Sequence, residues 1–318
     1  MSIFKLDPAF KDYIWGGTRL RDEYGKKCDY DKVAESWELS CHKDGPSVVA
    51  DGEYKGLTLN EYIEKAGKGV LGKNCERFEN FPILIKLIDA KDNLSVQVHP
   101  DNDYAMRVEG EYGKTEMWYV VDCDEGATLL YGFKHEITKE EFARRIADNT
   151  LLEVTNAVPV KKGDVFFIKS GTLHAIGKGI LIAEIQQNSN TTYRIYDYGR
   201  VGKDGKPREL HVDKALDVTK LAPAEQYPET PVEKKDGYDI KLLSKCEYFT
   251  TYRVNVETKA ELDADENSFN SILVLEGEPV ISGGETVSAK KGESVFISAG
   301  TGKYIVEGKC TFVLTKID

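Results

Sequence analysis

The sequence predicts a mainly β protein built of two tandem jelly-roll barrels with small helical insertions. Short runs rich in Val, Ile, Phe and Tyr are separated by Gly, Asp and Asn, as in proteins made of many short strands. The segment KKGDVFFIKSGTLHAI, which starts at Lys161, is echoed by KKGESVFISAGTGKYI, which starts at Lys290. MWYVVDCDEGATLL and SILVLEGEPVISGG form a second similar pair. A strand-rich unit that occurs twice favours two barrels in tandem.

Composition and charge exclude several classes of protein. Of the 318 residues, 41% are hydrophobic and 31% are charged, as in ordinary soluble proteins. The net charge of −11 argues against a general nucleic-acid binder, although a few cations in a pocket can still bind a phosphorylated small molecule. No apolar run approaches the roughly 18 residues that span a bilayer. The N-terminus lacks the pattern of a signal peptide.

The six cysteines contain no C-x-x-C pair, which indicates reduced thiols and a cytoplasmic protein. We therefore expect neither a membrane nor a nucleic acid as partner. The expected assembly is a monomer or a homodimer.

Three segments carry helix signals. Thr58 and Thr138 are each followed three residues later by Glu, the spacing of a capping box, which predicts helices in TLNEYIEKAG and TKEEFARRIADN. The second helix should run into a short helix through LLEV, so that a helical insertion covers about residues 137–155. LHVDKALDV, near residues 210–218, is the third candidate.

The segment KLAPAEQYPETPVEKKDGYD, residues 220–239, predicts a domain boundary because three prolines and many charges replace the apolar rhythm. We expect a catalytic domain at residues 1–230 that carries a metal site. We expect a C-terminal jelly roll without metal ligands at residues 236–318.

The stretch LSVQVHP places Gln97 and His99 on the same face of a strand, because successive side chains alternate between faces. Pro100 then ends the strand, since it has no N–H to donate. A polar face with Gln and His inside a β-rich domain needs a partner, and a bound metal is one candidate. Taken alone, a His in a strand is more often a satisfied polar residue than a ligand.

A second stretch, GDVFFIKSGTLH, consists of a turn, an apolar strand and a tight glycine turn before His174. It resembles the second signature of the cupin superfamily, although Lys169 stands where that signature usually has Pro. Glu116, in GKTEMWYVV, begins another strand. Together with Gln97 and His99, these residues would supply two imidazole nitrogens, one carboxylate oxygen and one amide oxygen. That set suits zinc or another first-row divalent ion and leaves room for substrate or water.

The internal repeat provides a control for this prediction. Where the first copy has His174, the second has Lys303, and where the first has Glu116, the second has about Asn270. The fold pattern therefore survives without the ligands, so the fold alone does not require these polar residues. This favours a functional role for the first copy.

Seven motifs together resemble type I mannose-6-phosphate isomerase in its short bacterial form, over about residues 4–220: LSVQVHPD, GKTEMWYV, SGTLHAIGKGILIAEIQQNS, NTTYRIYDYGR, RELHVDKALDV, YIWGG and AESWELS. Members of that family are zinc-dependent enzymes that interconvert mannose 6-phosphate and fructose 6-phosphate. The resemblance implies one zinc ion per chain on the four residues described above. It also implies catalytic roles for Arg194, Lys114 and Glu184, and a substrate cleft with Ser95, Trp15 and Glu35.

Such an isomerisation moves a proton between the first two carbons of the sugar through a cis-enediol(ate). A Lewis-acid metal can polarise the carbonyl and stabilise the developing oxyanion. Arg194 suits a developing negative charge or a phosphate, because guanidinium is permanently charged and can bind in a bidentate way. Lys114 should project to the same side as Glu116 and could reach the sugar or the phosphate. The sequence does not assign the catalytic base.

Asn190 departs from the family pattern, which usually has an aspartate ahead of the arginine, within the substrate cleft. An Asn side chain keeps a hydrogen bond but cannot exchange a proton at neutral pH. We expect Asn190 to orient the substrate or Arg194.

Other interpretations remain open at this point. Lys114 could be a solvated residue in a turn, and Arg194 could pair with Asp197 or Glu184. A different sugar could be the substrate of a cupin isomerase with the same mechanism. The chain could also be a non-catalytic sugar-phosphate-binding cupin. A metal-dependent oxygenase fits less well, because Gln97 fills a fourth ligand position.

Overall fold

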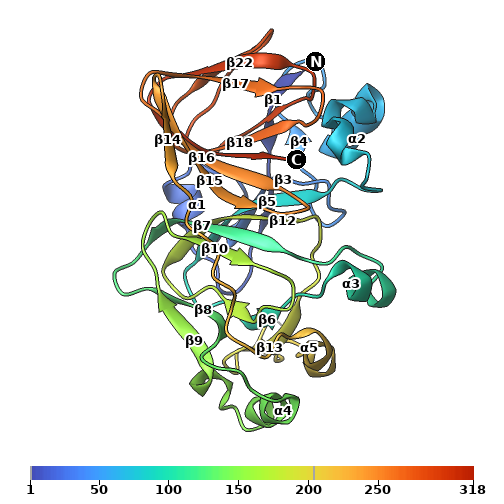
Figure 1. The fold of residues 1–318 in the computed structure, drawn as a ribbon, viewed down its shortest axis with the longest axis vertical. Coiled ribbons are helices and arrows are strands. Elements are labelled where there is room, and N and C mark those ends of the chain that lie inside the picture. Colours follow the sequence, from blue (N-terminus) through green and yellow to red (C-terminus); the bar gives the residue numbers. More distant parts are fainter. Residues whose placement is uncertain (1, 203–204) are drawn as a thin grey trace.

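The computed structural model describes residues 2–202 and 205–318, which form four β-sheets stacked face to face (Figure 1). The outermost sheet, at the top of Figure 1, contains β17 (Lys259–Ala264), β22 (Gly302–Glu307), β19 (Val280–Ser282) and β20 (Thr286–Ser288). The next contains, in spatial order, β14 (Val232–Lys235), β15 (Tyr238–Lys245), β16 (Thr250–Val256), β23 (Cys310–Lys316), β18 (Asn270–Gly277), β21 (Ser294–Ile297), β1 (Ile3–Asp7) and β4 (Val48–Val49).

The other two sheets form the unit that holds the candidate site. The third sheet contains β10 (Val165–Ile168), β7 (Glu116–Cys123), β12 (Ile180–Gln187), β5 (Ile83–Ala90), β3 (Glu35–Leu39) and β2 (Ala9–Lys11). The fourth contains β13 (Tyr193–Tyr196), β6 (Val96–Val98), β11 (His174–Ala175), β8 (Thr128–Phe133) and β9 (Thr155–Pro159). The predicted mainly β fold with two jelly-roll units is confirmed, each unit being a pair of facing sheets rather than a closed barrel.

Helices lie at the periphery of the stack (Figure 1). The α-helices are α1 (Arg19–Asp22), α2 (Leu59–Ala66), α3 (Asn102–Val108), α4 (Lys139–Ala147) and α5 (Val212–Val218), and the 3-10 helices are η1 (Lys68–Leu71), η2 (Lys73–Cys75) and η3 (Leu151–Glu153). The capping box at Thr58 forms, and the Thr138 side chain caps α4. The LLEV segment is only a 3-10 turn, and the sequence analysis missed α3, which Asp101 caps. None of the described helices combines the length and hydrophobicity needed to cross a membrane.

The N-terminal strand crosses between the two units. β1 pairs antiparallel with β21, so residues near the N-terminus extend the sheet of the C-terminal unit. β1 and β4 thus add N-terminal residues to the sheet of the C-terminal unit. The domain boundary that the sequence places between residues 230 and 236 stays a prediction.

Side chains on three neighbouring strands alternate between two buried faces of the sheet, and the polar residues of the site lie on one of these faces. On β12, the odd-numbered Leu181, Ala183 and Ile185 belong to the core cluster shared with the eight-stranded sheet. The even-numbered Ile180 and Ile182 belong to the core beneath the five-stranded sheet. Because side chains alternate, the even-numbered polar residues of β5, β7 and β12 share this second face: Lys86, Glu116 and Glu184.

The two units meet through aromatic packing. Phe269 is fully buried, and its ring lies 5.5 Å from Phe81 of the first unit and 5.2 Å from Phe296 of the second. We expect Phe269→Ala to lower the free energy of unfolding by about 3–5 kcal/mol, because it leaves a cavity between the sheets.

Urea denaturation measures this change. Val232→Ala, at a residue that is 46% exposed on the edge strand β14, is the control and should change the free energy by less than about 0.5 kcal/mol. A Phe269→Ala loss as small as that of the control would show that the two units do not depend on this contact.

Candidate functional site

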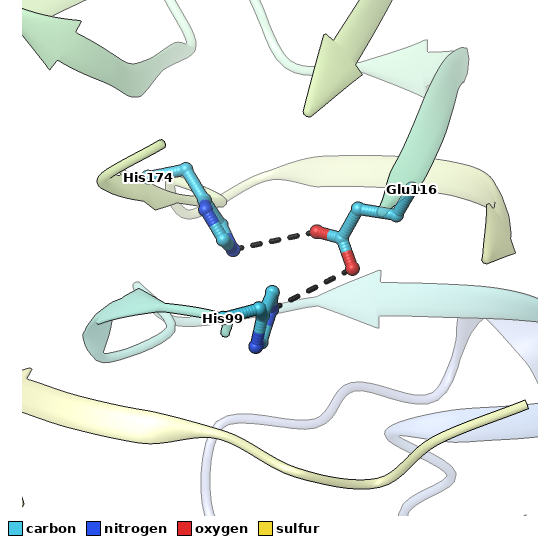
Figure 2. Close-up of side chains that lie close together, drawn as sticks. All are labelled: His99, Glu116 and His174. Carbon is cyan, nitrogen blue, oxygen red and sulfur yellow. Dashed lines mark ion pairs between the residues drawn. The ribbon is translucent and has the colours of Figure 1, made fainter. Parts of the chain in front are cut away.

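His99, Glu116 and His174 come together at the end of the first jelly roll (Figure 2). The Nε2 atom of His174 lies 3.3 Å from Oε1 of Glu116, and Nε2 of His99 lies 3.6 Å from Oε2 of the same carboxylate. All three side chains are at most 1% exposed. Neither Nε2 atom nor either carboxylate oxygen has a hydrogen-bond partner among the described residues. Buried polar atoms are rarely left in this state without a ligand or water.

The backbone orients both imidazoles. Nδ1 of His99 lies 2.9 Å from the carbonyl oxygen of Thr191, and Nδ1 of His174 lies 2.8 Å from that of Thr172. Since a carbonyl only accepts, each Nδ1 carries the proton and donates it, which leaves the Nε2 lone pair free for a metal. Gln97 is the cross-strand partner of His174, so the predicted fourth ligand lies beside the other three.

Burial keeps the two histidines neutral. Burial lowers the pKa of His174 to about 4. Burial, together with Lys114 and His174, lowers the pKa of His99 well below its ordinary value. Neutral imidazole is the form that binds a metal. Burial and the nearby Glu184 carboxylate raise the pKa of Glu116, because together they outweigh the opposing effect of the Lys114 and Lys86 ammonium groups.

A polar pocket of about 250 Å³ adjoins the cluster. Lys114 lines the pocket and places its Nζ atom 3.3 Å from Oε2 of Glu116, on the side that the sequence predicts. Of the residues predicted from the sequence, the pocket lining contains Trp15, Glu35, Ser95, Gln97, Lys114, Glu184, Asn190 and Arg194. The structure thus brings the predicted residues into one place.

The sequence analysis missed Lys86, which also lines this pocket and is 3% exposed. Its Nζ atom lies 3.2 Å from Oε1 of Glu184 and 3.5 Å from Oε2 of Glu35. The indole N–H groups of Trp118 and Trp37 donate to the same two carboxylates, at 2.9 Å and 2.7 Å. A lysine inside the apolar strand PILIKLIDA was the signal that could have revealed it.

Lys86, Glu35 and Glu184 form an array of buried charges that stabilise one another. Burial alone would lower the pKa of Lys86, but Glu35 and Glu184 outweigh burial and raise it. Burial alone would likewise raise the pKa of Glu184, but Lys86 and Lys114 hold it below its ordinary value. Glu184 is therefore a carboxylate at neutral pH and Lys86 an ammonium.

Arginines gather at another part of the pocket wall. Asp197 accepts from Arg208, at 2.8 Å and 2.5 Å, and from Arg200. Among the described residues, neither Asp197 nor Glu184 forms an ion pair with Arg194. Nη1 of Arg194 donates to the carbonyl of Glu209 at 2.9 Å, while its buried Nε has no partner among the described residues. Arg208 lines the pocket together with Arg194. Tyr13 and Thr192, also missed from the sequence, complete this lining.

The paired jelly rolls and the buried His/Glu/His cluster beside a polar pocket define a cupin-type enzyme. Comparison with known proteins agrees. The family model "Phosphomannose isomerase type I, catalytic domain" matches residues 3–126, and "Mannose-6-phosphate isomerase, cupin domain" matches residues 239–317.

Individual relatives match almost the whole chain. Mannose-6-phosphate isomerase ManA of Bacillus subtilis is 39% identical over 312 residues, which cover 98% of this chain and 97% of that protein. Mannose-6-phosphate isomerase of Streptococcus mutans is 40% identical over 291 residues, covering 89% and 88%. The crystal structure of the mannose 6-phosphate isomerase from B. subtilis matches with a TM-score of 0.93 and 38% identity over 99% of both chains. The chain belongs to the type I phosphomannose isomerase family.

Because the array around Lys86 is buried, removing its cation should lower the stability of the protein. We expect Lys86→Met to lower the free energy of unfolding by about 3–5 kcal/mol, because it leaves two buried carboxylates without their cation. Urea denaturation is the measurement. Lys91→Met, at an exposed residue directly after the same strand, should change stability by less than about 0.5 kcal/mol. Equal effects of the two substitutions would contradict this account of the array.

Proposed function

We propose that this protein is a zinc-dependent mannose-6-phosphate isomerase, which interconverts mannose 6-phosphate and fructose 6-phosphate through a cis-enediol(ate). The observation that carries the proposal is the group of buried nitrogen and oxygen atoms of His99, Glu116 and His174 that lack hydrogen-bond partners among the described residues, beside a polar pocket. Relatives named for this activity match nearly the whole chain, which supports the same substrate here.

The residues proposed to hold zinc are Gln97, His99, Glu116 and His174. Two neutral imidazoles and a carboxylate, with an amide oxygen from Gln97, suit this ion. The unpaired buried atoms of the cluster fit the same role, since such atoms are costly unless they bind something. When bound, the ion supplies a Lewis acid that polarises the carbonyl oxygen of the open-chain sugar.

The charges of the pocket suit a phosphorylated sugar. Glu35, Glu116 and Glu184 face Lys86 and Lys114, so that, once Glu116 is ionised as a metal ligand, these five residues carry one more negative charge than positive. A divalent cation reverses that balance and leaves a net positive interior. Such an interior favours an anionic substrate and the negative charge that develops on the enediolate.

Arg194 is proposed to bind the phosphate or the developing negative charge. Its buried Nε atom has no partner among the described residues, and its guanidinium lines the pocket without a carboxylate partner in an ion pair there. A planar guanidinium with free N–H groups can bind a phosphate or an enediolate in a bidentate way.

Glu184 is proposed to accept a proton at the reacting carbons, and Lys114 is proposed to stabilise the negative charge there. The lysines hold the pKa of Glu184 below its ordinary value, so Glu184 is ionised at neutral pH, which is the form in which a carboxylate can accept a proton. Lys114 carries donors that can hold the sugar oxygens. Trp15 is 4% exposed, and its ring lies 5.6 Å from that of Tyr13, which supplies an apolar wall for the sugar. Ser95, Glu35 and Asn190 are proposed to bind substrate hydroxyls.

The proposal includes a cytoplasmic location and a monomer or homodimer. All six cysteines are free, as is usual in a reducing compartment.

The first test is metal dependence. Protein stripped of metal should not form fructose 6-phosphate from mannose 6-phosphate, and one equivalent of zinc per chain should restore turnover. His174→Ala should abolish stoichiometric zinc binding and lower turnover by at least about 100-fold, since it removes a ligand. His135→Ala, at an exposed histidine outside the pocket, is the control and should behave as wild type. Full zinc binding without turnover would favour a non-catalytic binding protein or a different sugar.

The second test concerns Arg194. We expect Arg194→Lys to lower kcat/KM for mannose 6-phosphate by about 100-fold while zinc content is retained, because the lysine keeps the charge but loses the planar fork. Arg144→Lys, at an arginine that is 58% exposed on α4, is the matched control. Steady-state kinetics and metal analysis measure both effects. Unchanged kcat/KM in Arg194→Lys would place Arg194 outside the substrate site.

A further inference from the structure

Asn190 has a defined orientation at the edge of the pocket. Its side-chain Nδ2 lies 2.9 Å from Oδ2 of Asp44, and Asn190 lines the pocket. A carboxylate only accepts hydrogen bonds, so the NH₂ end of the amide must face Asp44. The amide oxygen then points away from Asp44 and makes no hydrogen bond with the described residues.

Asp44 is itself held in place by its own turn. The backbone N–H of Asp44 donates to Nδ1 of His42 at 3.1 Å, and its carbonyl accepts from Lys11. The turn packs closely on Trp37, because a Cβ added to Gly45 would lie 3.1 Å from Cε3 of that ring. The His42 ring also contacts Trp37, with a centroid distance of 5.7 Å. These contacts hold the backbone that carries the Asp44 carboxylate, while the carboxylate itself is 44% exposed.

A second carboxylate fixes the backbone next to Asn190. Glu111 lies 3.5 Å from the Asn190 N–H and 3.4 Å from the Thr191 hydroxyl, both of which donate to it. The Thr191 carbonyl in turn orients His99, at 2.9 Å. Asn190 thus sits on a segment whose backbone is tied to the metal cluster, so the position of its side-chain oxygen relative to that cluster is defined.

We infer that Asn190 is a specificity-determining residue, whose side-chain oxygen accepts a hydrogen bond from a hydroxyl of the bound sugar phosphate. Asp44 is the positioning residue that sets this orientation, although it does not line the pocket. The inference rests on the proposed function and deepens it. Because the reaction uses the first two carbons, the oxygen on the fifth carbon closes the pyranose ring and the phosphate is on the sixth, the hydroxyls on the third and fourth carbons are the ones to test.

The experiment compares mannose 6-phosphate with its 3-deoxy and 4-deoxy analogues in zinc-loaded wild type, Asn190→Ala and Asp44→Ala. One analogue should lose about tenfold in kcat/KM with the wild type, the size of one hydrogen bond. That penalty should fall below about twofold in both variants, which should also be about tenfold slower on mannose 6-phosphate. A merely structural role would slow all three substrates equally.

A reversed pair provides an independent test. Asn190→Asp alone places two carboxylates against each other and should lower kcat/KM at least about tenfold. Adding Asp44→Asn restores a donor–acceptor pair, again with an oxygen free for the pocket, and should recover kcat/KM to within about threefold of wild type. Asp148→Ala, at a carboxylate that is 56% exposed and outside the pocket, is the control.

Two results would overturn the inference: both analogues keep their full penalty in Asn190→Ala, or the reversed pair is no faster than Asn190→Asp. Melting temperature and zinc content, measured for every variant, identify those that fail to fold. Absence of wild-type turnover would instead reject the proposed function. In that case calorimetric binding of the same three sugar phosphates to wild type and Asn190→Ala decides the inference.

Discussion

The ion pairs of Lys86 with Glu35 and Glu184 constrain the rest of the site. Moving an unpaired charge from water into a protein interior costs several kcal/mol even after relaxation, so buried charges persist only with close partners. Lys86 pairs with both carboxylates, at 3.5 Å and 3.2 Å, and each carboxylate also accepts a hydrogen bond from an indole N–H group. Because β3, β5, β7 and β12 are adjacent, the strand register itself delivers these partners. The same register sets Glu116 at the start of β7, where the histidines reach it.

The second jelly roll packs against the opposite face of the sheet that carries this array. The strands that carry Lys86 and Glu184 on one face bury Leu87, Ala183 and Ile185 on the other, within the core shared with the C-terminal sheet. A polar face can be held rigid only if the opposite face is well packed, since a loose sheet would let water and rotamer freedom into the array. Phe269 and its aromatic neighbours provide that packing, and β1 adds a covalent link between the units. The C-terminal unit thus supports the site although its residues do not line the pocket.

The parts that the sequence predicted are those with local signals. The positions of Gln97, His99, Glu116 and His174 follow from strand alternation and a glycine turn, and the helices after Thr58 and Thr138 follow from their caps. Lys86 was missed because its partners come from other strands, and alternation alone does not tell which charges will meet. The Arg208–Asp197 pair joins residues 11 positions apart, and the pairing of β1 with β21 joins residues almost 300 apart in the sequence. Such contacts depend on tertiary structure, which short stretches of sequence do not predict.

The second copy of the repeat shows what this fold does when no ligand has to be held. Asn270 stands where the first copy has Glu116, and its amide donates to the hydroxyl of Tyr304 and to the carbonyl of Asp263, both at 2.9 Å. Lys303, the counterpart of His174, has a side chain that is 75% exposed and pairs with Glu261. The two equivalent positions of the second copy therefore find partners among the residues of their own unit. In the first copy the Nε2 atoms and the carboxylate oxygens make no hydrogen bond with the described residues, although Nζ of Lys114 lies 3.3 Å from Oε2 of Glu116. The difference lies in the residues and not in the fold, and buried polar atoms are rarely left in this state without a ligand or water.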